Sequence, residues 1–155
     1  MTRAGTAPAE SFEDLRTRSE ALYHDWLQPP RPRIAVAIDT SSLVAGADAV
    51  REAIEAEADR RNAAVDCGRV IGVGMQWLNP LVTITWPDAA AAVYGPVTVD
   101  DAALIVDEAT GKEGAAVALA IGTLTGSRPG IAPLSEHAFF APETERRLLA
   151  RIGHT

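Results

Sequence analysis

Apolar residues near the start of the chain recur with the period of a helix. They follow one another at steps of three, four and seven residues, which is the stripe of an amphipathic helix. Ser11 precedes them and can cap that helix, whereas the proline-rich run at 28–32 cannot continue it, because proline lacks an N–H and restricts the residue before it. The stripe consists of Phe12, Leu15, Leu22, Tyr23 and Trp26.

A strand and a second helix are predicted next. The apolar run at 33–38 is bounded by turn residues and is typical of a buried strand. Asp39, Thr40, Ser41 and Ser42 offer N-caps for a helix whose charged residues at 51–60 share the solvated side. A second strand is expected to begin at 63–67. The apolar stripe of this helix consists of Val44, Ala47, Val50, Ile54 and Ala58.

The middle of the chain predicts a hairpin and a third helix. Residues 81–86 alternate with period two and are rich in β-branched side chains, and 91–94 form the returning strand after a turn at Pro87-Asp88. Thr98 then caps a helix that carries acidic residues in its first turn, where they meet the helix dipole favourably.

The order of these elements predicts an α/β fold in four segments. We expect a disordered tail at 1–10, the N-terminal helix and proline-rich joint at 11–31, and the main domain at 32–110. Residues 111–155 complete the chain: 111–130 is expected to be irregular and glycine-rich, with an apolar stretch at 115–121, and a last helix is expected at about 142–151.

Composition narrows the class of protein. The 155 residues carry a net charge of −7, which argues against a nucleic-acid partner, because phosphate binding needs clustered basic residues. No apolar run is long enough to span a membrane and the start lacks the apolar stretch of a signal peptide. We therefore expect a soluble, cytoplasmic domain without membrane insertion.

Candidate chemical groups are few. The single cysteine, Cys67, excludes an intrachain disulfide and a four-cysteine metal site, and it is interpreted as a buried small apolar residue. Gly72-Val73-Gly74 lacks the third glycine opening a helix that a dinucleotide loop needs. Ser41 lacks the glycines that flank a nucleophilic serine, and nothing places a nucleophile beside His137. These patterns predict no catalytic residue.

Several short motifs resemble one known family. They are Pro-Arg-Ile-Ala-Val at 32–36, Ala-Gly-Ala at 45–47, Asn-Pro-Leu-Val at 79–82, Val-Tyr-Gly-Pro-Val-Thr at 93–98 and Pro-Gly-Ile-Ala-Pro-Leu-Ser-Glu-His-Ala-Phe-Phe-Ala-Pro at 129–142. Their order is similar to that in the N-terminal region of the NADH- and FMN-binding subunit of complex I, bidirectional hydrogenases and soluble NAD-dependent formate dehydrogenases. The β subunit of those formate dehydrogenases is the branch that the chain resembles most. The resemblance covers about residues 11–153 and implies a thioredoxin-like fold of the two-iron two-sulfur ferredoxin type, with a small mixed sheet, flanking helices, an N-terminal helix and a C-terminal extension.

The resemblance also implies a degenerate iron–sulfur site. Many members hold the cluster with two pairs of cysteines, and such clusters need thiolate ligands. Here the first pair falls near Ala37 and on Ser41 or Ser42, and the second pair falls on Gly72 and Gln76. Cys67 is out of register with these positions. We therefore expect no metal site and no cofactor in this chain.

The function implied by the resemblance is that of a non-catalytic docking module, with the other subunits of an NAD-linked oxidoreductase as partners. FMN and NAD belong to a downstream flavin domain in the family, and the sequence stops at Thr155, so we expect either a fragment of that subunit or its front module alone. The alternative is a stand-alone redox or electron-carrier protein, which one cysteine disfavours. A free-standing regulatory domain is a third hypothesis.

The loop at 72–79 supplies the candidate contact residues. In cluster-binding members of the family this loop covers the cluster. Here no cluster is expected, yet the loop contains the large apolar residues Met75, Trp77 and Leu78. Large apolar side chains in that situation either fold inward, filling the vacated space, or contact another protein. We predict that Trp77 is the anchor if the loop is an interface, because aromatic residues dominate binding hot spots.

Overall fold

A mixed β-sheet lies at the centre of the molecule, for which a computed structural model describes residues 11–140. Within these residues the sheet has five strands in the order β2-β1-β3-β4-β5. β1 is parallel to β2, whereas β3 is antiparallel to both of its neighbours, β1 and β4, and β5 is antiparallel to β4. The strands are β1 (Arg33–Ala37), β2 (Asp66–Val70), β3 (Val82–Thr85), β4 (Ala91–Tyr94) and β5 (Ala120–Thr125).

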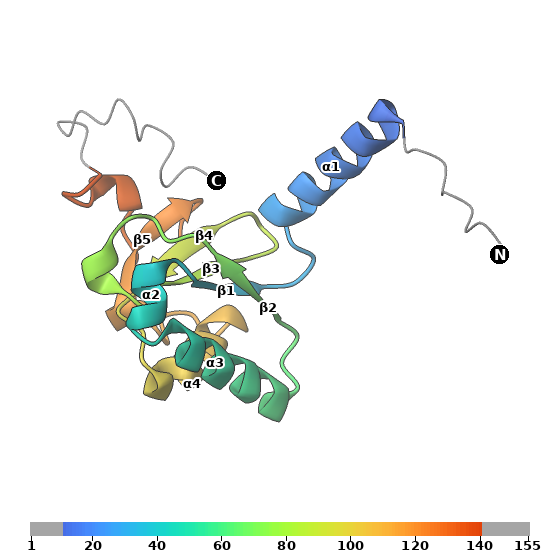
Figure 1. Cartoon of the computed structure of the whole chain (residues 1–155). Coiled ribbons are helices and arrows are strands. Elements are labelled where there is room, and N and C mark those ends of the chain that lie inside the picture. The colour runs from blue at the N-terminus through green and yellow to red at the C-terminus, as the bar shows by residue number, and fades with distance from the viewer. Residues whose placement is uncertain (1–10, 141–155) are drawn as a thin grey trace, which may run out of the picture.

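This strand order is that of a thioredoxin-like core, and the predicted fold class is confirmed. A β1-helix-β2 unit supplies the parallel pair and the β3-β4 hairpin with its following helix supplies the rest. Figure 1 shows the sheet with its helices and the N-terminal helix extending away from it. The helices are α1 (Phe12–Leu27), α2 (Thr40–Val44), α3 (Ala47–Arg61) and α4 (Ala102–Ala109).

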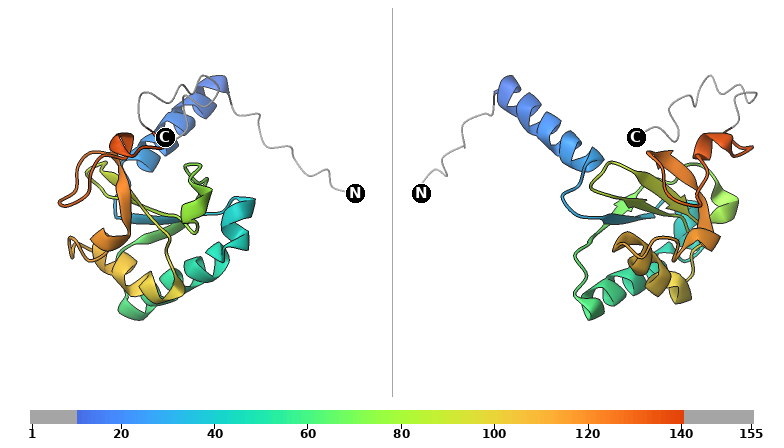
Figure 2. Two further views of the ribbon diagram at one scale, coloured as in Figure 1. Left: turned by 90° about the vertical axis from the view of Figure 1, so that its left-hand side faces the viewer. Right: turned by 180° about the vertical axis from the view of Figure 1, so that it is seen from behind.

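Two helices cover one face of the sheet. α3 and α4 lie side by side beneath the strands, as Figure 2 shows, and their apolar stripes bury against alternate residues of β1, β3 and β4. Because every second residue of a strand faces the same side, Ile34 and Val36 of β1 and Ile84 of β3 meet Ile54 of α3 in this main core.

Loops cover part of the opposite face. Ala37 and Val93 point away from α3 and α4 and pack with Met75, Leu81 and Leu134 in a second, smaller core. The loop that follows β2 and the segment after β5 therefore lie over the same side of the sheet. They belong to regions separated by more than fifty residues along the chain.

The segment after α4 departs from the prediction. Residues 120–125, expected to be irregular, form β5 and extend the sheet past residue 110. β5 pairs with β4 through two register shifts. Gly122 within it has Leu134 so close that a β-carbon there would lie 2.7 Å from the Leu134 Cα. The strand was missed because alanine and glycine give it a weak strand pattern, and pairing with β4 overrides that local preference.

The helix after β1 is divided in two. Asp39 caps α2, which ends at Val44, and Gly46, with φ +95°, redirects the chain into α3. Val44 was placed on the buried stripe together with Val50, but it is 86% exposed whereas Val50 is buried. That prediction is wrong for Val44, because the break rotates α2 away from the face that α3 presents to the sheet.

The remaining boundaries follow the prediction closely. Ser11 and Asp14 form a capping box at the start of α1, and Thr98 and Asp101 form another ahead of α4. The second strand begins at Asp66 rather than Ala63. The tail at 1–10 and the helix expected at 142–151 lie outside the described residues. Of the helices between residues 11 and 140, none has both the length and the apolar composition to cross a membrane.

Candidate functional site

A network of polar side chains joins two loops at one end of the sheet. Asp39, directly after β1, accepts hydrogen bonds from the hydroxyl of Ser41, from the Ser42 backbone N–H at 3.0 Å and from the Ser42 hydroxyl at 2.9 Å. Asn79, at the end of the other loop, donates from Nδ2 to the Ser41 hydroxyl at 2.9 Å. The loops after β1 and after β2 are therefore linked by side chains.

The carboxylate of Asp39 is the centre of this network. The hydrogen bond from Ser41 lowers the pKa of Asp39 below its ordinary value, with further lowering by the Ser42 N–H and hydroxyl, although burial opposes these effects. Asp39 is thus held ionised, and its charge is used to position Ser41 and Ser42 in the first turn of α2.

The four positions that the resemblance assigns to cluster ligands have different surroundings. Ala37 is fully buried, and a β-carbon built on Gly72 would lie 3.6 Å from the Ala37 Cβ and 2.8 Å from Asp39 Oδ2. Ser41 reaches the same place through its bond to Asp39. The structure therefore brings Ala37, Ser41 and Gly72 together. Gln76 is exposed at the start of a short 3-10 helix, Gln76–Leu78.

The side chains gathered here cannot ligate a cluster of the family's kind. Thiolate sulfur is the usual ligand, and these positions supply a methyl group, a hydroxyl already engaged by Asp39 and a bare backbone. The Asp39 carboxylate also fills the space that a side chain at position 72 would need. Across the described part of the chain, no group of three or more His, Cys, Asp or Glu residues could hold a metal ion.

Apolar side chains are exposed on the two linked loops. Leu43 and Val44 of α2 are 43% and 86% exposed, and Trp77, in the loop tied to α2 by Asn79, is 60% exposed. We call Leu43, Val44 and Trp77 the apolar rim. An exposed apolar cluster bordered by polar residues is typical of a protein contact surface.

The three candidate contact residues lie in different environments. Met75 is fully buried in the smaller core, so of the two alternatives it follows the one in which the side chain folds inward. Leu78 is partly buried against the same core. The ring of Trp77 packs edge to face on Phe139 with centroids 4.9 Å apart, and Phe139 packs in the same way on Phe140.

Phe139 and Phe140 were missed as neighbours of Trp77. They lie more than sixty residues further along the chain, and the 129–142 motif was interpreted only as a mark of resemblance. The signal that was available is the adjacent pair of large aromatic residues in a segment with little predicted secondary structure. Asp39 was expected as a helix cap and as the start of the loop at 39–43, but its link to Asn79 through Ser41 depends on the tertiary fold.

The other candidate chemical groups are a cysteine, a histidine and a glycine-containing loop, and none of them has the surroundings that a catalytic or phosphate-binding group needs. Cys67 is exposed on β2, so the prediction that it is buried is wrong, because its side chain lies on the solvent side of this edge strand. Partial desolvation still raises the pKa of its thiol, and the nearby carboxylates of Glu55 and Asp59 raise it further, so the thiolate form that a nucleophile requires is disfavoured. His137 Nδ1 accepts a hydrogen bond of 3.1 Å from the Phe139 N–H. Gly74 has a positive φ and leads into the three-residue Gln76–Leu78 turn, not into a helix that could cradle phosphate.

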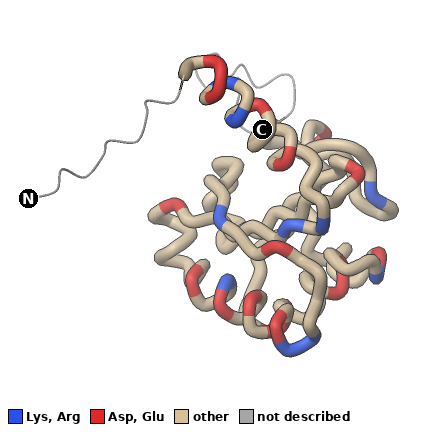
Figure 3. The backbone as a smooth tube through the Cα atoms, turned by 90° about the vertical axis from the view of Figure 1, so that its right-hand side faces the viewer, with Lys and Arg blue, Asp and Glu red and all other residues tan. Residues whose placement is uncertain are grey.

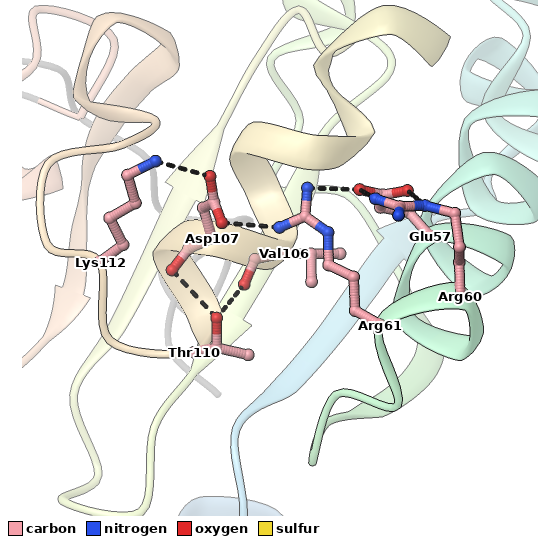
Figure 4. Close-up of polar contacts among 7 residues, drawn as sticks. All are labelled: Glu57, Arg60, Arg61, Val106, Asp107, Thr110 and Lys112. Carbon is pink, nitrogen blue, oxygen red and sulfur yellow. Dashed lines mark hydrogen bonds and ion pairs between the residues drawn. The ribbon is translucent and has the colours of Figure 1, made fainter.

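A second polar cluster links α3 to α4, the two helices that cover one face of the sheet. Arg61 of α3 bonds Asp107 of α4 at 2.6 Å and also contacts Glu57, while Lys112 reaches Asp107 at 3.0 Å (Figure 4). The hydrogen bond from Arg60 lowers the pKa of Glu57 to about 2, with Arg61 contributing. These are paired charges on two packed helices, and we assign them to the cohesion of α3 with α4.

Between residues 11 and 140, charge is distributed without a basic patch. Figure 3 shows blue and red segments interspersed along the tube, with acidic residues prominent on α1 and α3. Such an arrangement does not provide the clustered cations that phosphate backbones require.

Comparison with known proteins gives likenesses to solved structures only. No family model matches the chain, and no curated protein matches it. A solved structure, the wild-type thioredoxin-like [2Fe-2S] ferredoxin from Aquifex aeolicus, is similar over 50% of this chain and 84% of that chain, with 16% sequence identity and a TM-score of 0.42. A likeness of this size carries no argument, and the fold assignment rests on the strand order and register.

Proposed function

We propose that this chain is a non-catalytic, cluster-less docking module of an NAD-linked oxidoreductase. Its partners are the other subunits of such a complex, with the soluble NAD-dependent formate dehydrogenases as the first choice and related NADH dehydrogenases and hydrogenases next. FMN and NAD belong, on this proposal, to the flavoprotein part of the complex and not to any residue of this chain.

The observation that carries the proposal is the polar network at the end of the sheet. Ser41 and Ser42 bond to Asp39, and Asn79 bonds to Ser41, at the positions that the resemblance aligns with the cluster loops. These hydrogen bonds supply a direct link between the two loops, which supports the proposal. With the loops fixed in this way, Leu43, Val44 and Trp77 remain exposed beside the network. An end of the sheet whose two loops are linked by hydrogen bonds, and which exposes the apolar rim, is suited to binding a protein surface.

The alternative of a redox or electron carrier has less support. A two-electron dithiol centre or a bound cluster needs at least two thiols, and the chain has Cys67 alone. The raised pKa of Cys67 also works against thiol chemistry at neutral pH.

A reconstitution experiment tests the cluster-less part of the proposal. The purified chain is incubated anaerobically with iron and sulfide, desalted, and assayed by visible and paramagnetic-resonance spectroscopy. We expect a colourless protein without stoichiometric iron. A stable cluster signal at one per chain would overturn this part of the proposal.

A co-purification experiment tests the docking part. The tagged chain is co-expressed with the catalytic and flavoprotein subunits of an NAD-dependent formate dehydrogenase, and the captured subunits are quantified. We expect capture by the wild type and at least tenfold less with Trp77→Ala, because the aromatic anchor is lost. Leu104→Ala, at a part-exposed residue of α4, is the matched control and should capture as the wild type does.

Thermal unfolding separates docking from packing. Trp77 is exposed on one side and touches Phe139 on the other, so Trp77→Ala should change the melting temperature little. If the variant loses several degrees of melting temperature and its folded fraction still captures partners, Trp77 is a packing residue and the docking role of the apolar rim is refuted.

A further inference from the structure

The N-terminal helix presents its whole apolar stripe to solvent. No residue of α1 is buried, and Phe12, Leu22 and Tyr23 are 77%, 63% and 58% exposed. Leu15 and Trp26 complete the same stripe and are also exposed. α1 extends away from the sheet in every view (Figures 1 and 2), and Arg33 of β1 joins it to the sheet by bonds to the Asp25 and Trp26 carbonyl oxygens at 3.1 Å.

A helix of this kind needs a partner for its stripe. Sixteen residues are close to the length below which an isolated helix is marginal in water, and most helices gain their stability by packing one apolar face. The capping box at Ser11 stabilises the first turn but leaves the stripe uncovered. Two aromatic residues at one end and one at the other make the stripe unusually costly to leave in water.

The charges that border the stripe select an antiparallel copy of the same helix. Arg16 and Glu20 lie one turn apart on one border, with their charged groups 3.7 Å from each other. Two antiparallel helices related by a twofold axis bring the same border of each together, so Arg16 of one copy meets Glu20 of the other. In a parallel, in-register pair Arg16 would face the other border, where Arg18 lies at nearly the same level.

A hollow at the base of α1 is placed to receive the partner's first turn. It has a volume of about 400 Å³ and lies between the last turn of α1 and the sheet, lined by Trp26, Leu27, Thr85, Ala91 and Thr125 among others. In an antiparallel pair centred near Ser19, residue 12 of one helix lies opposite residue 26 of the other. Phe12 of the second copy then reaches Trp26 and this hollow.

We propose that α1 pairs with α1 of a second copy of this chain, antiparallel and centred near Ser19, with Phe12 of each copy seated at the Trp26 end of the other. The contact is about 24 Å long, which follows from 16 residues at 1.5 Å each. One helix pair buries less surface than a standard stable interface, so we expect a reversible dimer that dissociates at a concentration on the order of 10 µM.

Sedimentation of the full chain tests the pairing. The wild type is expected to change from monomer to dimer between low micromolar and several hundred micromolar protein. Leu22→Glu places a charge within the stripe and should weaken association at least tenfold, and Phe12→Ala should weaken it about threefold to tenfold. Ala21→Glu, on the opposite side of the same helix, is the matched control and should associate like the wild type.

Distance measurements test the orientation. With Cys67 replaced by serine, a spin label at Glu13→Cys should give an interchain separation of about 18 Å along the helix axis in the antiparallel pair, because each label lies six residues from the centre. A label at Ser19→Cys should give a much shorter separation. A short separation at position 13 would mean a parallel pair and would overturn the proposal.

The remaining outcomes are decisive as well. A chain that stays monomeric at several hundred micromolar overturns the proposal, as does a dimer that Leu22→Glu leaves unchanged. The pairing does not depend on the docking role of the apolar rim: Trp77→Ala should dimerise normally, and Leu22→Glu should still capture oxidoreductase subunits if that role is correct.

Discussion

α1 and α3 are helices of nearly equal length with similar sequence patterns and opposite surroundings. Both have an apolar residue about every third or fourth position, and both carry several ion pairs on their polar side. α3 buries Ala47, Val50, Ile54 and Ala58 against the sheet, whereas α1 buries none of its larger apolar residues. The periodic pattern therefore specifies a helix and its apolar face, but not what covers that face.

Side-chain size explains part of the difference. α3 presents alanine, valine and isoleucine, which allow a helix to approach a sheet closely and fill the space between them. α1 presents phenylalanine, tyrosine and tryptophan, which are typical of the surfaces where proteins meet. The size of the residues in a stripe thus carries information that their spacing does not.

The largest expected difference between the two helices is in the cost of removing one apolar side chain. Ile54→Ala should lower the free energy of unfolding by about 2–5 kcal/mol, because Ile54 is fully buried and its removal leaves a cavity. Leu22→Ala should change it by less than about 0.5 kcal/mol. Urea unfolding below 2 µM protein, on the order of the monomer range expected from the small contact, measures both. A similar loss in the two variants would mean that α1 packs as α3 does.

The sequence predicted the elements better than their environments. Prolines, helix caps and the alternation of apolar and polar residues define α1, β1 and the β3-β4 hairpin, because these signals act on neighbouring residues. β5 was missed because its pairing with β4 comes from a distant part of the chain. At the site, the structure brings Ala37, Ser41 and Gly72 together, and the bond between Asn79 and Ser41 depends on how two loops are placed. No local signal encodes that contact.

Removing the helix cap of α2 should lower the free energy of global unfolding more than removing the helix cap of α1. Asp39→Ala removes the acceptor for Ser41 and for both Ser42 donors, and should cost about 1–2 kcal/mol of unfolding free energy. Ser11→Ala removes the cap of α1, where unfolding of the helix is local, and should leave the global transition unchanged. Amide hydrogen exchange should instead show faster exchange in α1 of that variant. Equal effects of both substitutions on global unfolding would contradict this expectation.

Acid should weaken α3 packing through Glu57. The pKa of Glu57 in the folded protein is about 2, and its ordinary value is 4.5, so the unfolded chain takes up the proton first as the pH falls. The stability that Glu57 contributes is therefore present above about pH 4.5 and is lost between that pH and pH 2. The lowered pKa of Asp107 acts in the same direction. Urea midpoints from pH 7 to pH 2 should fall less steeply for Glu57→Gln than for the wild type. The matched variant on α1, Glu20→Gln, should keep the wild-type slope.

The smallest expected effect on the free energy of unfolding is that of removing the Val44 side chain, because the predicted helix after β1 is in fact two helices. Val44 and Val50 were assigned to the same apolar face, yet Gly46 separates α2 from α3 and leaves Val44 in solvent. Val44→Ala should leave the free energy of unfolding within about 0.5 kcal/mol of the wild type, because alanine is also the better helix former. Val50→Ala is the matched control and should cost about 1.5–3 kcal/mol, the value of burying a valine side chain. If Val44→Ala costs as much as Val50→Ala, then α2 and α3 form one continuous helix in solution, and the apolar rim loses one of its three residues.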